Sequence, residues 1–248
     1  MVKLLLLLFM VNSLFAIITI DPVEPGEKDG LSGEIDFTFK ASGGNTEVED
    51  NDFGSKVQYD NNSSLFVHLL VYNFKEGRVE DSMVVKRSFA HYRFVKQLSA
   101  IAAVELYGQA ERDQFKNLNL RKLLGSGMRY KFVSTDTHKF YFGFGGYYSE
   151  EFYTAIDSVE EHRYLPRLNS YISYTDTFEH FIAALTLYYQ PSLKNFKDTN
   201  IVSDGSLTYK LTDTLALKIA GSYKKDTDPA LGNKKEDSFY STSISYTF

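Results

Sequence analysis

The chain has 248 residues, a formal net charge of −5, no cysteine and no tryptophan, and 15% aromatic residues from 18 tyrosines and 20 phenylalanines. The absence of cysteine excludes a disulfide scaffold, a thiolate metal site and a cysteine nucleophile, and the acidic balance argues against nucleic-acid binding. A mean hydropathy of −0.27, with no internal apolar run near ~18 residues, excludes a helical membrane protein. The large aromatic content therefore requires another explanation.

The N-terminus has the pattern of a secretory signal peptide. Lys3 gives a short positive start, an unbroken apolar run follows over residues 4–10, and small or polar residues lead to Ala16, so we expect cleavage after Ala16. A short anchoring helix is the alternative, but the run is too short to cross a ~30 Å hydrocarbon core. We expect a signal peptide over residues 1–16, a periplasmic lead over 17–29, and one domain over 30–248.

From residue 30 the chain alternates between two faces almost to its last residue. In the final segment Tyr240, Thr242, Ile244, Tyr246 and Phe248 share one face, and small polar residues fill the other. Apolar residues outward and small polar residues inward are typical of an outer-membrane strand, whereas a helix would repeat every 3.6 residues. The pattern predicts an all-β fold, a transmembrane antiparallel up-and-down β-barrel.

A weak repeat predicts the number of strands. Thr-Asp-Thr occurs at residues 135–137, 175–177 and 212–214, where short polar residues suit a tight turn. Each interval holds two strands, which gives about 12 strands, an even number as in bacterial outer-membrane barrels. The predicted strands are 30–43, 52–60, 64–74, 82–94, 99–111, 120–133, 139–149, 162–174, 178–190, 200–211, 215–224 and 238–248.

The connections are predicted to alternate in length. Short turns are expected near Asn61, Lys96, Asp136, Asp176 and Asp213, and longer charged loops at 44–51, 75–81, 112–119, 150–161, 191–199 and 225–237. Short periplasmic turns and longer outer loops would place both termini in the periplasm of a bacterial outer-membrane protein.

Outward aromatic residues are expected at both strand ends. Two interfacial girdles would account for the aromatic content; the alternative, a soluble sandwich or calycin-like barrel, would bury these rings. The two sets are Tyr59, Phe94, Phe132, Tyr174, Tyr209 and Phe248 at one end, and Phe53, Tyr148, Tyr164, Tyr189, Tyr223 and Tyr240 at the other.

The last residues resemble the assembly signal of outer-membrane barrels. Terminal Phe248 follows Tyr246, Ile244 and Tyr240 on the same face. We therefore expect the barrel-assembly machinery and periplasmic chaperones as partners during biogenesis, and outer-membrane lipid and lipopolysaccharide afterwards. Because the girdles are complete, we expect a monomer.

Three short motifs extend the resemblance to a family. They are Gly44-Asn45-Thr46, the stretch from Glu105 through Gln109 to Phe115, and Arg121-x-x-Leu124-Gly125-x-Gly127-x-Arg129-Tyr130. From about Leu31 to Phe248 the chain is similar to the salt-induced outer membrane protein family, a bacterial barrel family of unknown function. The extra Gly43 departs from the family pattern in the first loop. The resemblance implies no catalytic residue and no cofactor.

The inward face carries an excess of lysine and arginine over acids, while the rest of the chain is strongly acidic. A candidate luminal cluster comprises Arg87, His91, Arg93, Glu105, Gln109, Glu111, Arg121, Arg129, Lys131, Arg163 and Arg167. Two interpretations remain open. The cluster is either a plug of paired charges that stiffens the wall or an arginine-lined constriction that selects anions.

An enzyme is the third interpretation, since outer-membrane phospholipases are also 12-stranded. That family places a serine two residues after its histidine, but His68, His91, His138, His162 and His180 are followed there by Leu, Arg, Phe, Tyr and Ile.

The outer acids lack the spacing of a calcium loop, so a solvated face is favoured over cations bridging lipopolysaccharide, and no metal site is expected. We therefore expect a structural or envelope-stress-related barrel without enzyme activity, with a small anion-preferring channel as the alternative.

Overall fold

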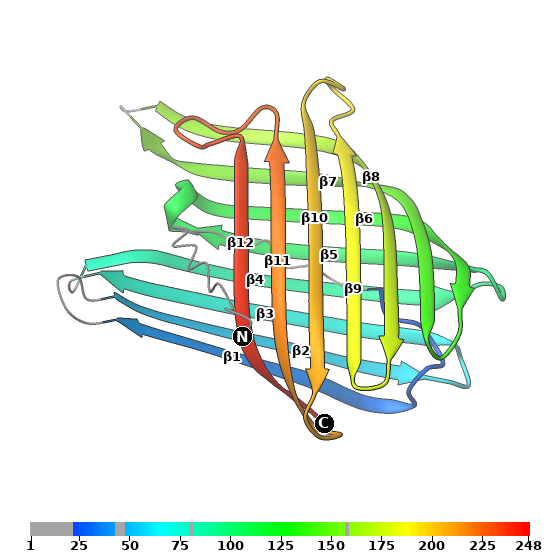
Figure 1. Cartoon of the computed structure of the whole chain (residues 1–248). Helices are drawn as coiled ribbons and strands as arrows, with labels where there is room; N and C mark the ends of the chain where they lie inside the picture. Colours follow the sequence, from blue (N-terminus) through cyan, green and yellow to red (C-terminus); the bar gives the residue numbers. More distant parts are fainter. Residues whose placement is uncertain (1–21, 43–47, 80–81, 157–158) are drawn as a thin grey trace, which may run out of the picture.

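The computed structural model describes residues 22–42, 48–79, 82–156 and 159–248, which form one closed antiparallel barrel of 12 strands (Figure 1). Each strand pairs with its neighbours in the chain, and β1 closes the barrel against β12. No helix in these ranges is long and apolar enough to cross a membrane. The elements are β1 Gly30–Ser42, β2 Val48–Asn61, β3 Phe66–Val79, β4 Ser82–Gln97, β5 Ala102–Asp113, the 3-10 turn η1 Gln114–Lys116, β6 Leu118–Ser134, β7 His138–Ile156, β8 Val159–Phe178, β9 Phe181–Pro191, β10 Thr199–Lys210, β11 Leu215–Asp226 and β12 Glu236–Thr247.

Every predicted strand coincides with one observed strand, but several predicted ends are wrong. Residues 75–79 belong to β3 and residues 150–156 to β7, so the expected loops 75–81 and 150–161 are largely strand. The second Thr-Asp-Thr lies inside β8, because β-branched threonine suits a strand as well as a turn; the chain reverses at residues 179–180 instead, where Glu179 has φ of +50°. The short turns expected near Asn61 and Lys96 lie at residues 62–65 and 98–101, directly after the strands that contain these two residues, and Asp136 and Asp213 lie in turns as predicted.

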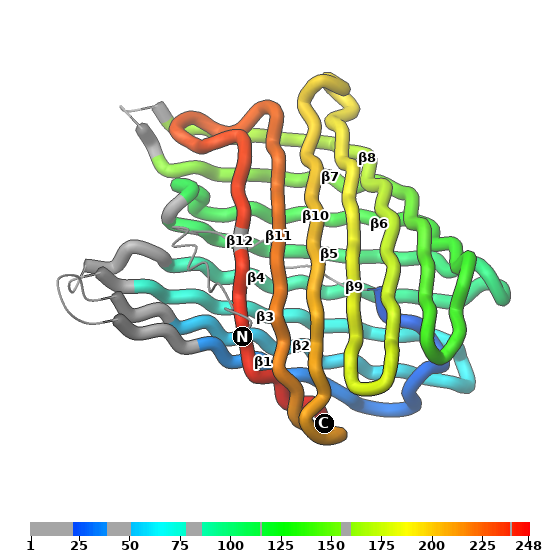
Figure 2. Tube along the Cα trace, viewed as in Figure 1, coloured from blue at the N-terminus to red at the C-terminus, as the bar shows by residue number. Residues whose placement is uncertain are grey.

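The connections define two ends of the barrel. The turn end carries residues 62–65, 98–101, 135–137, 179–180 and 211–214, together with the chain's last residue. The loop end carries the two longest described connections, 192–198 and 227–235, above β9–β12. Figure 2 shows β9–β12 crossing in front of β1–β8, with the C-terminus at the turn end below.

The alternation sorts side chains as the sequence predicts. The predicted girdle aromatics are exposed on the outer wall except Phe94, which is half-buried. Tyr240, Ile244 and Tyr246 of β12 are also exposed, and Phe248 exchanges backbone hydrogen bonds with Gly33 at 3.0 Å. The residues of the predicted assembly signal therefore lie on the outer wall beside the closing strand pair.

The pair that closes the barrel is short. β1 aligns with β12 only over Glu34–Phe37, against Ile244–Thr247, whereas its register with β2 runs through all 13 residues of β1. Among the described strands, residues 38–42 of β1 and 236–243 of β12 have no strand partner along this edge. Thr38 Oγ1 still donates to the Thr242 carbonyl at 3.5 Å. The seam is thus held by far fewer backbone hydrogen bonds than its neighbours.

Candidate functional site

The lumen contains a buried charge network centred on Glu105 of β5. Its carboxylate lies 3.2 Å from the Arg129 guanidinium of β6 and 3.7 Å from that of Arg93 of β4, and the Tyr171 hydroxyl of β8 donates to it at 2.9 Å. All of these side chains are buried. One carboxylate therefore holds two arginines from the strands on either side of its own.

A second group of ion pairs lies nearer the loop end. Glu111 accepts from Arg87 at 2.7 Å and from Arg121 at 3.1 Å. Arg121 also donates to Glu151 of β7 at 2.8 Å, and Arg87 lies 3.9 Å from Asp113. Cations and acids alternate around this wall, which stiffens β4–β7.

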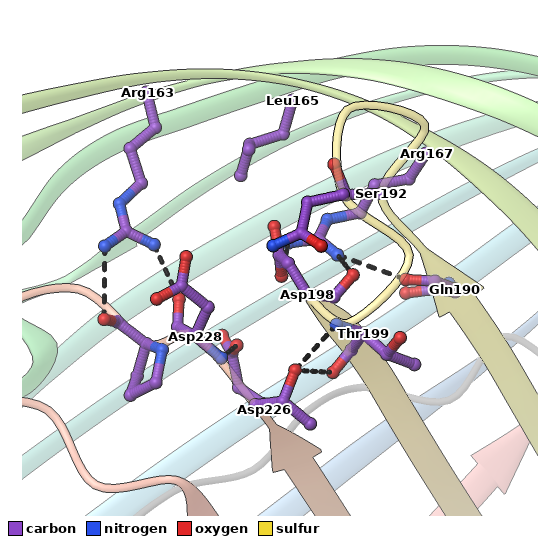
Figure 3. Close-up of polar contacts among 12 residues, drawn as sticks. Arg163, Leu165, Arg167, Gln190, Ser192, Asp198, Thr199, Asp226 and Asp228 are labelled. Carbon is purple, nitrogen blue, oxygen red and sulfur yellow. Dashed lines mark hydrogen bonds and ion pairs between the residues drawn. The ribbon is translucent and has the colours of Figure 1, made fainter.

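Not every member of the predicted cluster lies in this network. His91 is buried and stands opposite Gln109 in the β4–β5 register, as expected. Arg163 and Arg167 of β8 are bound elsewhere, as Figure 3 shows: Arg167 donates to Asp198 at 2.7 Å, and Arg163 donates to the Asp228 carbonyl at 2.6 Å. These two arginines fasten loop-end segments and do not line a central constriction together with Arg87.

The predicted cationic excess inside the barrel was overestimated. Asp113, Glu151 and Asp198 are buried and bind luminal arginines, although the first two were assigned to loops by the sequence pattern and the third lies in one. Lys75 was also missed for this reason. Lys75 and Glu151 could have been placed inside the barrel by extending the two-residue alternation through residues 75–79 and 150–156. No sequence pattern shows that residues 192–198 fold back onto Arg167.

Two glycines make room for the rings of the network. An added Cβ at Gly143 of β7 would lie 2.0 Å from the Tyr171 ring, and one at Gly125 of β6 would lie 2.5 Å from the Tyr107 ring. These tyrosines therefore lie flat against the inner wall where no side chain projects. Asn169 donates to the Tyr107 hydroxyl at 3.0 Å, which extends the polar network to β8.

Residues 22–29, here called the strap, cross the lumen at the turn end. At one side the backbone NH groups of Gly26 and Lys28 donate to Asp60 of β2 at 3.0 Å. At the other side Arg129 donates to the Val23 carbonyl at 2.6 Å, and Lys139 of β7 pairs with Glu27. The strap therefore spans from β2 to β6 and β7 and occupies part of this mouth.

Glu24 is the most heavily bonded side chain of the strap. It pairs with Lys131 and accepts from Ser134 at 2.7 Å and from Tyr141 at 2.6 Å. Burial alone would raise the pKa of Glu24, but the hydrogen bonds from Lys131, Tyr141 and Ser134 outweigh burial and lower the pKa below its ordinary value. Lys131, which was predicted as a member of the luminal cluster, therefore attaches the strap.

A small apolar core fixes the strap from the inside. Val23 packs with side chains of β3–β5. Between the strap and the β4–β5 turn only a cavity of about 20 Å³ is left, which has room for little more than one water molecule. The core residues are Val23, Val67, Leu69, Val71, Phe89, Val95 and Ala103.

The rest of the lumen is a series of cavities. One of about 390 Å³ lies at the loop end, one of about 120 Å³ lies centrally, and one of about 180 Å³ lies between β1–β4 and β9–β12. The first two share Arg121 and Lys224 as lining residues, and the last two share Arg87, Phe89 and Asp204. The open volume therefore runs beside the Glu111 ion pairs in the central cavity and continues along the small residues of β10–β12.

Three histidines bond to partners on the same or a neighbouring strand. Within the described residues, His68 bonds Tyr92 at 2.6 Å, His138 lies 3.1 Å from Asp176, and His162 lies 3.4 Å from Glu150. None of these partners is a serine. The described residues also contain no group of three or more potential metal ligands.

Comparison with known proteins agrees with the fold. Residues 35–248 match the family described as "Protein of unknown function, DUF481". No match to this chain was found among curated proteins. Among solved structures, the NanC porin has a TM-score of 0.52 at 11% identity over 88% of this chain and 98% of its own. The KdgM porin in complex with disordered oligogalacturonate has a TM-score of 0.50 at 10% identity over 88% and 99%. The fold is that of an outer-membrane β-barrel.

Proposed function

Since the chain belongs to the family described as "Protein of unknown function, DUF481", we propose a function from the lumen itself: a narrow outer-membrane channel for small hydrophilic solutes, restricted at its turn end by the strap. The observation that carries the proposal is the series of cavities that share lining residues from the loop end inward. The porin fold of the two similar structures is consistent with it.

We expect any anion preference to be weak. The central cavity is lined by four cations, Arg87, Arg93, Arg121 and Lys224, and three acids, Glu111, Glu151 and Asp204. Paired charges of opposite sign largely cancel the field that a solute feels. The structure thus supports a weaker selectivity than the sequence suggested.

A closed structural or envelope-stress-related barrel is the second candidate. It is favoured by the dense ion pairing around Glu105 and Glu111, which rigidifies the wall without serving transport. The two candidates differ in what the strap does. In a channel the strap is a removable restriction, whereas in a structural barrel it is one more brace.

Several finer assignments belong to the same proposal. We place both termini in the periplasm, because the turn end carries the shorter connections, and we propose a monomer without enzyme activity, assembled through the Phe248 signal. We also assign the chain to the salt-induced branch of barrels on the three motifs above. Two of the three motifs, those that contain Glu105 and Arg121, lie in β5 with η1 and in β6. The third motif, Gly44-Asn45-Thr46, lies outside the described residues. Protein abundance measured across NaCl concentrations tests this assignment.

The decisive experiment is single-channel recording in planar bilayers. The mature chain is compared with Glu24→Ala/Asp60→Ala, which removes one major attachment at each side of the strap. The control is Asp213→Ala, at an exposed turn residue that lines none of the three cavities. A channel should show small conductance steps that grow several-fold in the double variant and are unchanged in the control. Silence from correctly folded wild type and double variant alike would leave the structural barrel as the function.

A further inference from the structure

The loop-end cavity contains a cation that the ion-pair network does not use. Lys224 of β11 lines both the loop-end cavity of about 390 Å³ and the central cavity of about 120 Å³. Arg121 lines the same two cavities, and Lys116 of η1 lines the outer one. Three cations from η1, β6 and β11 therefore meet where a solute would pass from one cavity to the next.

The three cations differ in how they are bound. Arg121 is held by Glu151 at 2.8 Å and Glu111 at 3.1 Å, and Lys116 is held by Asp237 at 2.6 Å. In the described part of the chain, Lys224 makes neither an ion pair nor a hydrogen bond, although Asp226 and Glu111 are near enough to attract it. An ammonium group has three donors, and here they face a cavity.

A fixed loop covers this cavity. The connection 227–235 is held by Arg163, which donates to the Asp228 carbonyl at 2.6 Å and to the Pro229 carbonyl at 3.1 Å (Figure 3). Leu231 NH donates to Glu161 at 2.9 Å, and Asn233 donates to the Lys116 carbonyl at 3.1 Å. This cavity, here called the chamber, is thus bounded by a fixed loop, and it opens to solvent where its lining residues Lys234 and Glu236 are exposed.

We propose that Lys224, with Arg121 and Lys116 beside it, forms a binding site in this chamber for a small hydroxylated oxyanion, such as a monomeric sugar acid. This inference deepens the proposed channel and rests on it for its role in transport. A carboxylate is the preferred partner of an ammonium group, since charge-assisted hydrogen bonds are the strong ones. Asp226, Asn233 and Ser238 also line the chamber and supply polar groups for hydroxyls.

The size of the chamber agrees with this ligand class. A volume of about 390 Å³ lies within the range of small-molecule sites, whereas the central cavity beyond is only about 120 Å³. The acids Asp226, Glu236 and Asp237 in the same lining oppose accumulation of highly charged anions. The site therefore favours one negative charge surrounded by hydroxyl groups.

Isothermal titration of the folded full-length barrel in detergent tests the site, with gluconate as the probe, inorganic phosphate as a second anion and glucose as the uncharged comparison. Gluconate should bind, and Lys224→Met should weaken its affinity at least tenfold. The matched control is Lys225→Met, because Lys225 is the next residue and pairs with Glu236 at 2.8 Å on an exposed surface. Phosphate binding as tight as gluconate binding would contradict the hydroxylated class, and glucose binding as tight would contradict the anion site.

A second measurement needs no variant, and it decides the question if Lys224→Met does not fold. Acetic anhydride labelling of wild type, read by mass spectrometry, should acetylate Lys224 more slowly when gluconate is present, with no protection by glucose and none at Lys225. Equal labelling of Lys224 with and without gluconate would overturn the site. If the barrel binds gluconate but shows no conductance in bilayers, the binding site is supported and the channel is refuted. If the barrel conducts but does not bind gluconate, the channel is supported and the binding site is refuted.

Discussion

Replacement of Glu105 by glutamine is the sharpest test of the central network. The carboxylate is 3% exposed, its two arginine partners are 5% and 3% exposed, and they lie 3.7 Å and 3.2 Å away. Glutamine has nearly the same shape, so it removes the charge without leaving a cavity. Two buried guanidinium groups from β4 and β6 would then face a neutral amide.

The expected cost follows from that uncompensated charge. Breaking a buried ion pair by removing one partner costs about 3–5 kcal/mol. Two contacts survive in Glu105→Gln, because the amide oxygen can still accept from Tyr171, and Arg129 still donates to the Val23 carbonyl at 2.6 Å. We therefore expect the free energy of unfolding to fall by about 3 kcal/mol, the lower end of that range.

The chain has no tryptophan, so unfolding in guanidinium is followed by tyrosine fluorescence and by the mobility shift of the folded barrel on unheated gels. The control is Glu236→Gln, which removes a carboxylate from the exposed pair with Lys225 and should leave the midpoint unchanged, as is usual for surface ion pairs. If Glu105→Gln unfolds at the same midpoint as Glu236→Gln, the network does not stabilise the barrel and the reasoning is wrong.

Three further predictions concern the Gly143 contact, the strap and the β1–β12 seam. Gly143→Ala should lower the free energy of unfolding by about 1–3 kcal/mol, since its Cβ would overlap the Tyr171 ring, whereas Gly205→Ala, with its nearest atom at 3.7 Å, should be tolerated; equal effects would contradict this account. Because the pKa of Glu24 is lowered in the folded state, its contribution to strap stability is present above its ordinary pKa of 4.5 and is lost as pH falls through the lowered value. Bilayer conductance should therefore rise in acid for wild type, with a smaller acid response in Glu24→Gln, and an unchanged response would count against the strap as a restriction. Glu34→Cys/Thr247→Cys places a disulfide across aligned residues of the short β1–β12 seam; the oxidised form should unfold at a higher denaturant concentration than the same variant reduced, and equal midpoints would show that the seam is not the weak point.

The barrel was predictable because its signal is local. A strand with lipid outside and a lumen inside repeats every two residues, so the segment from Tyr240 to Phe248 reveals its two faces without knowledge of any partner. Strand ends were harder to predict. Charged residues such as Glu150 and Glu151 are typical of loops, and only the length of the facing strand decides that β7 continues through them.

The sequence predicts which residues of the strands face the lumen, but it does not predict all of the partners that these residues bind. Sequence alternation places Arg93, Arg129 and Glu105 inside, and their adjacency on β4–β6 follows from the strand order. The partners of Arg167 and Lys131 do not follow from it, because Asp198 lies in a loop that folds back and Glu24 lies in a segment that crosses the lumen. Such contacts depend on the path of irregular backbone, which carries no periodic signal.

The path of the proposed channel along β12 leads to a last prediction. Ser243 of β12 lines the cavity of about 180 Å³ together with Ser241 and Ala220, and Glu105 does not line this cavity. A phenylalanine at position 243 would occupy much of that volume. In the Glu24→Ala/Asp60→Ala variant, here called the strap-released barrel, Ser243→Phe should therefore reduce the conductance while the unfolding midpoint changes little. Glu105→Gln should show the opposite pattern, with lower stability and nearly unchanged conductance. If Ser243→Phe leaves the conductance of the strap-released barrel unchanged, solutes do not pass along β1 and β10–β12, and the proposed route is wrong.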